Sequence, residues 1–126
     1  MMEPRVQRSG ARTRIAIKRA YAAPAPKDGT RVLVDGLWPR GLRKDAARID
    51  VWLKEIAPSP ELRRWFHHDP ARWTEFQRRY RAELATRTAS VEALLRLAEN
   101  GPVTLLFGSA DVAHNNAVVL QSYLKG

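Results

Sequence analysis

The spacing of apolar and polar residues predicts three strands separated by loops and helices. Residues 14–18, "RIAIK", alternate apolar and polar positions as a half-buried strand does. Residues 31–34, "RVLV", form a short run rich in β-branched residues that suits a buried strand. Residues 103–107, "VTLLF", are continuously apolar, which is typical of a central strand covered on both faces. The prolines and the Asp-Gly pair between the first two segments predict a loop.

Helical spacing and helix-start residues dominate the middle of the chain. A short helix is expected over residues 51–56, opened by Asp50 or a neighbour and stopped by Pro58. Ser59, followed by a proline and a glutamate, predicts a helix that runs to about His67. Asp69, also followed by a proline, predicts a further helix. One face of that helix carries the apolar residues Trp73, Phe76, Tyr80 and Leu84.

Two more helices are expected towards the end of the chain. Ser90 is the predicted cap of the first, whose apolar stripe consists of Val91, Leu94, Leu95 and Ala98. The Asn-Gly-Pro sequence at residues 100–102 should end this helix. Asp111 is the natural cap of the last helix, whose stripe consists of Ala113, Ala117, Leu120 and Leu124.

This order of elements predicts an α/β fold: a single small Rossmann-like domain with a short, mostly parallel sheet flanked by helices. No internal repeat or second core is evident in the 126 residues. Residues 14–126 are therefore assigned to one α/β domain. Residues 1–13 show no periodicity and are predicted to be a disordered basic arm.

Composition narrows the possible chemistry. The chain has no cysteine, so thiolate nucleophiles, disulfides and cysteine-ligated metals are excluded. The net charge of +9 favours phosphorylated small molecules, nucleic acid or anionic lipid without choosing among them. No apolar run reaches the roughly 20 residues that span a bilayer, and the basic start lacks the apolar segment of a signal peptide. A cytoplasmic protein that does not associate with membranes is expected.

The arginine-rich stretches have two interpretations each. The first 20 residues carry six cationic side chains against Glu3 alone, which suits a solvated tail or an arm that holds nucleic acid. Arg78, Arg79 and Arg81 could line a nucleic-acid groove. Glu75 and Glu83, however, are spaced to pair with Arg79, which favours an ordinary solvated helix face.

Candidate ligand-binding residues follow all three predicted strands. Ligands of open parallel sheets bind beyond the carboxyl ends of the strands. Residues from the three segments should therefore gather at one edge: Lys18, Arg19, Tyr21, Asp35, Trp38, Arg40, Ser109, Asp111, His114 and Asn115. Arg31, in the second strand, is added to the ligand-binding candidates.

The segment "VDGLWPRGL", residues 34–42, is the most distinctive of the three. Pro39 favours an extended Trp38, and the glycines at 36 and 41 permit turns that other residues resist. An indole beside the Arg40 guanidinium suits a base, a sugar or a phosphate. The alternative is that Trp38 packs in the core while Arg40 pairs with Asp35 or a helix end.

Proton transfer would fall to four candidate catalytic residues: His68, Asp35, Asp111 and His114. His67 and His68 lie between two predicted helices, where a histidine either titrates or caps the last carbonyls. Asp111 either takes part in anion chemistry or only caps the last helix. The three histidines lack metal-ligand spacing, so neither a metal nor another cofactor is expected.

Several motifs together resemble the YeaO-like family of small uncharacterised bacterial proteins, part of the domain-of-unknown-function 488 superfamily. They are "KRAY", "DGTRVLVDGLWPRG", "WLKEIAPSPELRRWFHHDP", "FQRRYRAEL", "VTLLFGSAD" and "HNNAVVLQSYL". The resemblance extends from about Ile15 to Leu124 and implies a Rossmann-like α/β domain without a settled activity.

The resemblance also implies that a reactive group is missing. Other members of the superfamily carry a cysteine and a glutamate just after the last strand, and "CHR" at the start of the final helix. The corresponding positions here hold Phe107 and Ser109, then Asn115, Asn116 and Ala117. Activity that depends on that thiol is not carried over, whereas Asp111 and His114 correspond to retained residues.

The leading hypothesis is a basic, Trp/Arg-lined strand-end pocket that binds a phosphorylated small molecule or nucleotide, with hydrolysis as a further option. Arg40 and either Lys18 or Arg19 would hold the anion, and Trp38 would stack. His68 with Asp35 or Asp111 would move protons. The alternative is a nucleic-acid-binding module without catalysis that uses the basic surface and the arm. The sequence leaves the oligomeric state open.

Overall fold

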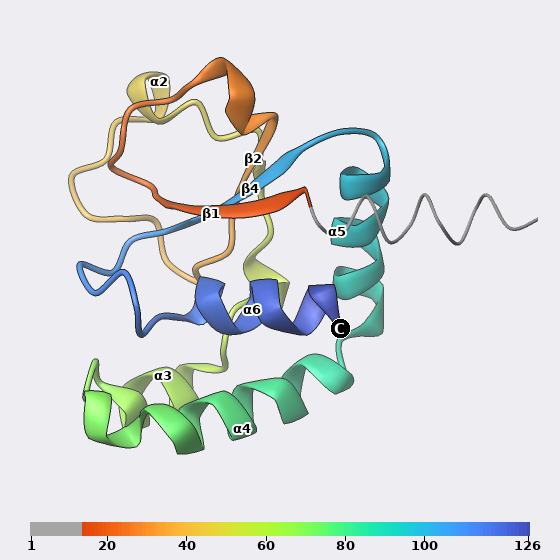
Figure 1. The fold of residues 1–126 in the computed structure, drawn as a ribbon. Coiled ribbons are helices and arrows are strands. Elements are labelled where there is room, and N and C mark those ends of the chain that lie inside the picture. Colours follow the sequence, from red (N-terminus) through yellow and green to blue (C-terminus); the bar gives the residue numbers. More distant parts are fainter. Residues whose placement is uncertain (1–13) are drawn as a thin grey trace, which may run out of the picture.

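The computed structural model describes residues 14–126, and its centre is a four-stranded parallel sheet (Figure 1). The strands are β1 (Ile15–Arg19), β2 (Thr30–Leu33), β3 (Val51–Trp52) and β4 (Val103–Phe107), in the order β1-β4-β2-β3. Every residue of β4 is buried, as expected for a central strand. The predicted α/β class with a parallel sheet is confirmed. The predicted arm, residues 1–13, lies outside the described residues.

The register aligns the ends of the three longer strands. Ile15 of β1 and Thr30 of β2 both pair with Val103 at the start of β4. Because all three run parallel from this common level, their carboxyl ends meet at one edge of the sheet. The segments that follow β1, β2 and β4 therefore begin side by side.

Residues 51–56 do not form the predicted helix, and this prediction was wrong. Val51 and Trp52 instead pair with β2, whose free edge offers unpaired backbone groups, and only Lys54–Ile56 form a single 3₁₀ turn. Asp50 caps nothing, because its carboxylate accepts the Arg31 backbone N–H at 2.8 Å. A four-residue helix before this segment, α2 (Lys44–Ala47), was not predicted.

The next two helices begin where the sequence indicates. α3 (Pro60–Phe66) is capped by Ser59, whose Oγ accepts the Leu62 N–H at 3.2 Å. Asp69 caps a 3₁₀ turn, Pro70–Arg72, that continues into α4 (Trp73–Ala85). The predicted apolar face of α4 lies in the core, with Tyr80 and Leu84 fully buried.

The caps of the last two helices differ from the predictions. α5 (Thr88–Glu99) begins two residues before Ser90, after Arg87, which is fixed by carbonyls and by Glu83. α6 (Asn116–Lys125) is capped by Asn115, whose Oδ1 accepts the Val118 N–H at 3.1 Å. Asp111 does not cap α6, because a turn separates it from the helix.

The two faces of the sheet are covered differently. Helices α3 to α6 lie on one face in Figure 1, and they form with it the larger core cluster, which contains Val32, Leu105, Tyr80 and Leu120. α2 and the loops cover the other face, where a smaller cluster surrounds Leu33 and Leu106. We call this second side the loop face. Within residues 14–126, no helix combines the length and apolar character required to cross a membrane.

Candidate functional site

A pocket of about 550 Å³ opens beyond the carboxyl ends of β2 and β4, and we call it the strand-end pocket. Its position matches the general rule for ligand sites of open parallel sheets. Seven residues predicted to belong to a site line it: Tyr21, Asp35, Trp38, Arg40, His68, Ser109 and Asp111. They come from four separate segments of the chain, so the fold brings together most of the predicted set.

Asp35 is held at the wall of this pocket by the loop after β4. Its Oδ2 accepts the Gly108 N–H at 2.8 Å. A Cβ on Gly108 would lie 3.2 Å from the same oxygen, so glycine permits this close approach. Burial raises the Asp35 pKa, and the Gly108 amide, the Asn116 side chain and the positive charges of Arg63 and His68 only partly oppose the rise. Asp35 is therefore protonated more readily than an ordinary aspartate.

Trp38 both packs against the interior and lines the pocket, so the structure combines the two positions between which the sequence left a choice. Its indole N–H donates to the Leu42 carbonyl at 2.8 Å, and its ring meets the Trp52 ring edge-on at 5.4 Å. Trp38 thus packs against the small cluster of the loop face while also lining the strand-end pocket. The ring is consequently fixed, which suits a surface for a flat ligand.

Arg40 lies on the pocket wall without a side-chain partner among residues 14–126. The alternative, in which Arg40 pairs with Asp35 or a helix end, is not observed. Its backbone is held instead, because the Tyr21 hydroxyl donates to the Arg40 carbonyl at 2.7 Å. An exposed guanidinium on a fixed backbone is available to bind an anion.

Arg19 positions the pocket without lining it. Its Nε donates to the Ser109 carbonyl at 2.9 Å, and its guanidinium lies 4.8 Å from the centre of the Tyr21 ring. Arg19 therefore links the end of β1 to the loop after β4. This places Tyr21 and Ser109 on the same wall.

Arg63 of α3 also lines the pocket, and sequence reasoning did not identify it. A Cβ on Gly36 would lie 3.3 Å from Arg63 Nη1, so this guanidinium rests against the glycine backbone. Gly36 thus provides space, whereas Gly41 has a positive φ of 74°, a conformation that glycine adopts readily. Like Arg40, Arg63 has no ion-pair or hydrogen-bond partner for its side chain in the described part of the chain. No local sequence signal distinguishes it from its neighbour Arg64.

The two adjacent histidines have separate roles. Both adopt left-handed backbone conformations, with φ of 47° at His67 and 54° at His68, which are uncommon for residues other than glycine. The His67 N–H donates to the Arg63 carbonyl at 3.0 Å and so ends α3. The reversal turns His68 onto the pocket wall. His68, rather than His67, is the histidine placed to meet a ligand.

Asp111 and His114 form a pair at the edge of the pocket. Asp111 Oδ2 lies 3.0 Å from His114 Nδ1, and Asp111 Oδ1 accepts the Ala113 and His114 N–H groups. The Ala113 amide, followed by the His114 side chain, lowers the Asp111 pKa. The His114 ring packs edge-on against Trp73 at 5.1 Å, so it is absent from the pocket wall. Of the pair, only Asp111 faces the cavity.

Asn115 and Asn116 divide their roles in a similar way. Asn115 is buried as the cap of α6, and its amide donates to the Asp111 carbonyl at 2.9 Å. Asn116 lines the pocket, and its amide donates to the Val34 carbonyl at 3.0 Å. The structure therefore places Asn116 in the position where Asn115 was predicted to contact a ligand.

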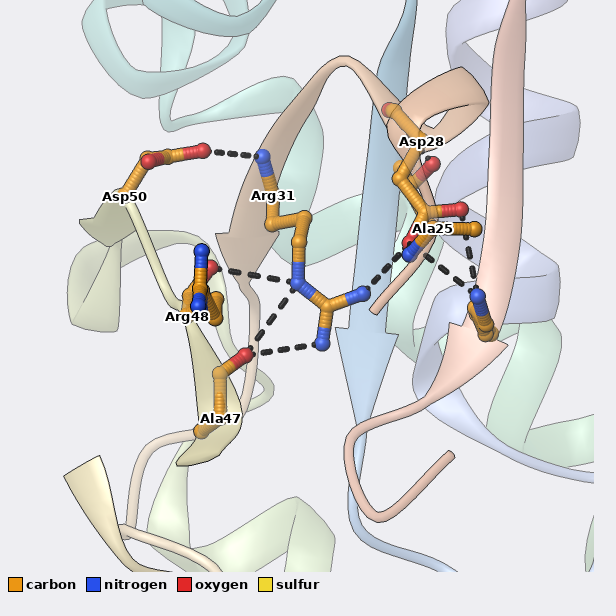
Figure 2. Close-up of polar contacts among 8 residues, drawn as sticks. Ala25, Asp28, Arg31, Ala47, Arg48 and Asp50 are labelled. Atoms are coloured by element: carbon orange, nitrogen blue, oxygen red, sulfur yellow. Dashed lines mark hydrogen bonds and ion pairs between the residues drawn. The ribbon is translucent and has the colours of Figure 1, made fainter. Parts of the chain in front are cut away.

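Lys18 and Arg31 lie outside the pocket, and both bind Asp28 on the loop face. Figure 2 shows the contacts of the buried Arg31 in this network. Arg31 Nη1 lies 2.6 Å and Lys18 Nζ 3.0 Å from Asp28 Oδ2. The remaining Arg31 donors point to the carbonyls of Ala47 and Arg48, as Figure 2 shows. Arg31 is only 3% exposed, so its charge is used to hold β2 to the neighbouring segments.

The acidic residues of α4 pair with arginines, though not entirely as predicted. Glu75 pairs with both Arg78 and Arg79, whereas Glu83 binds Arg87 and Ser59 in place of the expected Arg79. Across residues 14–126, no cluster of three or more histidine, aspartate or glutamate side chains is arranged to hold a metal ion.

Comparisons with known proteins match nearly the whole chain. The family model DUF488-N3i, described as "Inactive DUF488-N3 subclade", matches residues 14–126. An uncharacterized protein of Mycobacterium tuberculosis is 45% identical over 114 residues, which cover 90% of this chain and 96% of that protein. The uncharacterized protein YeaO of Escherichia coli is 40% identical over 111 residues, which cover 88% and 96% respectively. No solved structure matches the chain.

Proposed function

The chain belongs to the YeaO-like DUF488 family, in the subclade described as inactive, and on this premise we propose that it binds a phosphorylated or nucleotide-like ligand without hydrolysing it. The family membership agrees with the resemblance found in the sequence. The proposed ligand site is the strand-end pocket.

The observation that carries the proposal is the pair of guanidiniums on the pocket wall. Neither Arg40 nor Arg63 has a hydrogen-bond or ion-pair partner for its side chain among the described residues, although both line the same cavity, where the charge of Arg63 acts on the Asp35 carboxyl. Most other arginines near the sheet are bound by carbonyls or carboxylates, as Arg19 and Arg31 are. Two unpaired cations in one concave site favour an anion with several oxygens, such as a phosphate.

The rest of the pocket suits a flat organic group attached to that phosphate. The half-buried Trp38 and the exposed Tyr21 offer aromatic surface, and Pro39, Ala57 and Pro58 add further apolar wall. Asp35, whose pKa burial raises, offers a fixed carboxyl on the same wall. This combination of an apolar wall with a few fixed polar groups is typical of small-molecule sites.

Binding without hydrolysis is favoured over the catalytic alternative by the chemistry of the site. At the position where the superfamily resemblance places a cysteine, Phe107 is buried in the core at 2% exposure. The family description "inactive" agrees with this loss. Asp35 and His68 are the residues on which a hydrolytic activity would depend, and they supply the test.

Calorimetric titration of the full chain with inorganic phosphate, sugar phosphates and nucleotides tests the proposal. A phosphorylated compound should bind to the native protein and bind at least about tenfold more weakly to Arg40→Ala. Arg64→Ala is the matched control, because it removes an exposed arginine of α3 that is absent from the pocket wall. Equal loss in both variants, or no binding by any compound, would overturn the proposal.

Product analysis of the same mixtures decides between binding and hydrolysis. We expect each bound compound to be recovered intact after prolonged incubation. Turnover that disappears in both Asp35→Asn and His68→Ala would establish the hydrolytic alternative instead.

Nucleic-acid binding is a second candidate, favoured by two arginine side chains that lie close to one aromatic ring of α3. The guanidiniums of Arg72 and Arg79 lie 5.2 and 4.4 Å from the centre of the Trp65 ring. Such a site resembles the stacking surfaces that hold single strands. This candidate predicts binding to an oligonucleotide that falls steeply with salt and with Trp65→Ala. Weak dependence on both would exclude it.

A further inference from the structure

A second hollow adjoins the strand-end pocket and extends it beyond the size of one nucleotide. It has a volume of about 670 Å³ and is lined by the segments before α3 and at the start of α5, so we call it the α5 hollow. The two cavities share five wall residues: Gly36, Leu37, Ala57, Pro58 and Arg63. Each volume is in the range that holds one drug-sized ligand. Together they form a site with two compartments.

The shared wall combines a cation with an exposed apolar side chain. Arg63 is the unpaired guanidinium already described, and it rests against Gly36 between the two compartments. Leu37 is 63% exposed, one of the three exposed large apolar side chains in residues 14–126. A positive group beside an apolar side chain, on a wall that both compartments share, suits a ligand whose charge lies at its centre.

The compartments themselves differ in character. The strand-end pocket has the aromatic wall of Trp38 and Tyr21, whereas the α5 hollow carries the hydroxyl groups of Thr88 and Ser90. Neither hydroxyl has a hydrogen-bond partner among the described residues. Ring stacking is therefore available on one side of Arg63, and hydrogen bonding to a sugar or a base edge on the other.

From this arrangement, and resting on the proposed function, we propose that the ligand is a phosphate-bridged dinucleotide. One nucleoside lies in the strand-end pocket, the bridging phosphate meets Arg63, and the second nucleoside crosses Leu37 into the α5 hollow. A single nucleotide fills only the first compartment and leaves Thr88 and Ser90 unused.

Calorimetry with two matched sets of compounds tests this inference. The first set is the four ribonucleoside 3′-monophosphates, and the second is the four homodinucleotides in which two identical nucleosides are joined by a 3′→5′ phosphodiester. We expect the preferred dinucleotide to bind about tenfold more tightly than its mononucleotide, even though the monophosphate carries more negative charge. A preference based on charge alone would give the opposite order.

The substitution Ala89→Trp locates the second nucleoside. Ala89 is exposed on the wall of the α5 hollow, so a large ring there fills the hollow without removing a polar group. It should abolish the dinucleotide advantage and leave mononucleotide affinity within about twofold of the native value. If Ala89→Trp still binds the dinucleotide more tightly than the mononucleotide, the second nucleoside does not lie in the α5 hollow.

The outcomes separate this inference from the proposed function. Equal or weaker binding of every dinucleotide, with mononucleotides still bound, overturns the inference alone. Absence of binding by both sets also overturns it, and the wider panel of phosphorylated compounds then decides whether the strand-end pocket binds a ligand at all.

Discussion

The arginines around the sheet fall into two regions that use the same side chain for opposite purposes. On the loop face, Arg31 is 3% exposed and its guanidinium is bound by Asp28 and two carbonyls. In the strand-end pocket, Arg40 and Arg63 are exposed, and neither guanidinium has a hydrogen-bond or ion-pair partner among residues 14–126. The first arginine is part of the scaffold, whereas the other two are available to a ligand.

The carboxylates of the two regions differ in the same way. At Asp28, burial acts to raise the pKa, but the Ala25 amide and the Lys18 and Arg31 charges outweigh it and hold the pKa below its usual value. At Asp35, burial is the larger effect and raises the pKa. Asp28, which is surrounded by donors, has the lowered pKa of a structural carboxylate. Asp35, which has fewer donors, has the raised pKa that is common among carboxyl groups of functional sites.

The largest expected effect comes from removing the acid of the loop-face network. Asp28→Ala leaves the buried Arg31 guanidinium without its counter-ion, so the free energy of unfolding should fall by about 3–5 kcal/mol. Urea denaturation measures this loss. Asp45→Ala, which removes an exposed ion pair with Arg43, should cost less than about 1 kcal/mol. Similar losses in the two variants would show that the network is not the scaffold.

Asp28→Asn is a milder substitution at the same position, and it tests how the stabilisation by the ionised Asp28 depends on pH. The native Asp28 pKa is lowered, so its contribution to stability is fully present above the ordinary value of 3.8 and is lost as pH falls through the folded-state pKa. The difference between the native protein and Asp28→Asn should therefore narrow in acid. If the difference in the free energy of unfolding stays constant from neutral pH to acid, the assignment of a lowered Asp28 pKa is contradicted.

A smaller effect, on binding and not on stability, is expected at the pocket cations. Arg40→Ala and Arg63→Ala should each cost about 1.5–3 kcal/mol of ligand binding, with the free energy of unfolding changed by no more than about 0.5 kcal/mol. Gly36→Ala refines this test, because the new Cβ would lie 3.3 Å from Arg63 Nη1 and displace the guanidinium without removing it. Calorimetry should then show an intermediate loss. A large drop in the unfolding temperature of either arginine variant would show that the arginine stabilises the fold, as Arg31 does.

Asp35→Asn should raise the free energy of unfolding at neutral pH, whereas Asp28→Asn should lower it. Because burial raises the folded-state pKa of Asp35, its protonated form favours the folded state, and this contribution is lost as pH rises from 3.8 through the folded-state pKa. The asparagine variant should therefore be more stable than the native protein at neutral pH. Its advantage should disappear in acid. Urea denaturation at pH 7 and at pH values below 3.8 measures the gain in stability and its loss. If the stabilities of the variant and the native protein change in parallel with pH, the assignment of a raised Asp35 pKa is contradicted.

Local spacing was sufficient to predict most of the scaffold. The strands β1, β2 and β4 and the starts of α3 and the following 3₁₀ turn depend on alternation, continuous apolar runs and Ser-Pro or Asp-Pro pairs, which act within a few residues. The failed prediction has a cause that is not local. Val51 and Trp52 became a strand because β2 offers a free edge, and that edge is created by residues distant in the sequence.

The site was only partly predictable for the same reason. Asp35, Trp38 and Arg40 directly follow a strand, so the edge rule located them. Arg63 comes from a helix that the fold brings to this edge, and its neighbour Arg64 has the same local pattern. Arg31 seemed equally suited to a ligand, but the Asp28 that neutralises it is held by a 3₁₀ turn that the sequence pattern did not reveal.

The smallest expected effect distinguishes the two adjacent histidines. Both have positive φ, so His67→Gly and His68→Gly should each relieve backbone strain, with a net gain of about 0.5–1 kcal/mol after the entropy of the unfolded chain is counted. Only His68 lines the pocket, so only His68→Gly should weaken ligand binding. Denaturation and calorimetry on the two variants make the comparison directly. If binding changes equally in both, the turn as a whole shapes the pocket, and the His68 side chain has no contact of its own with the ligand.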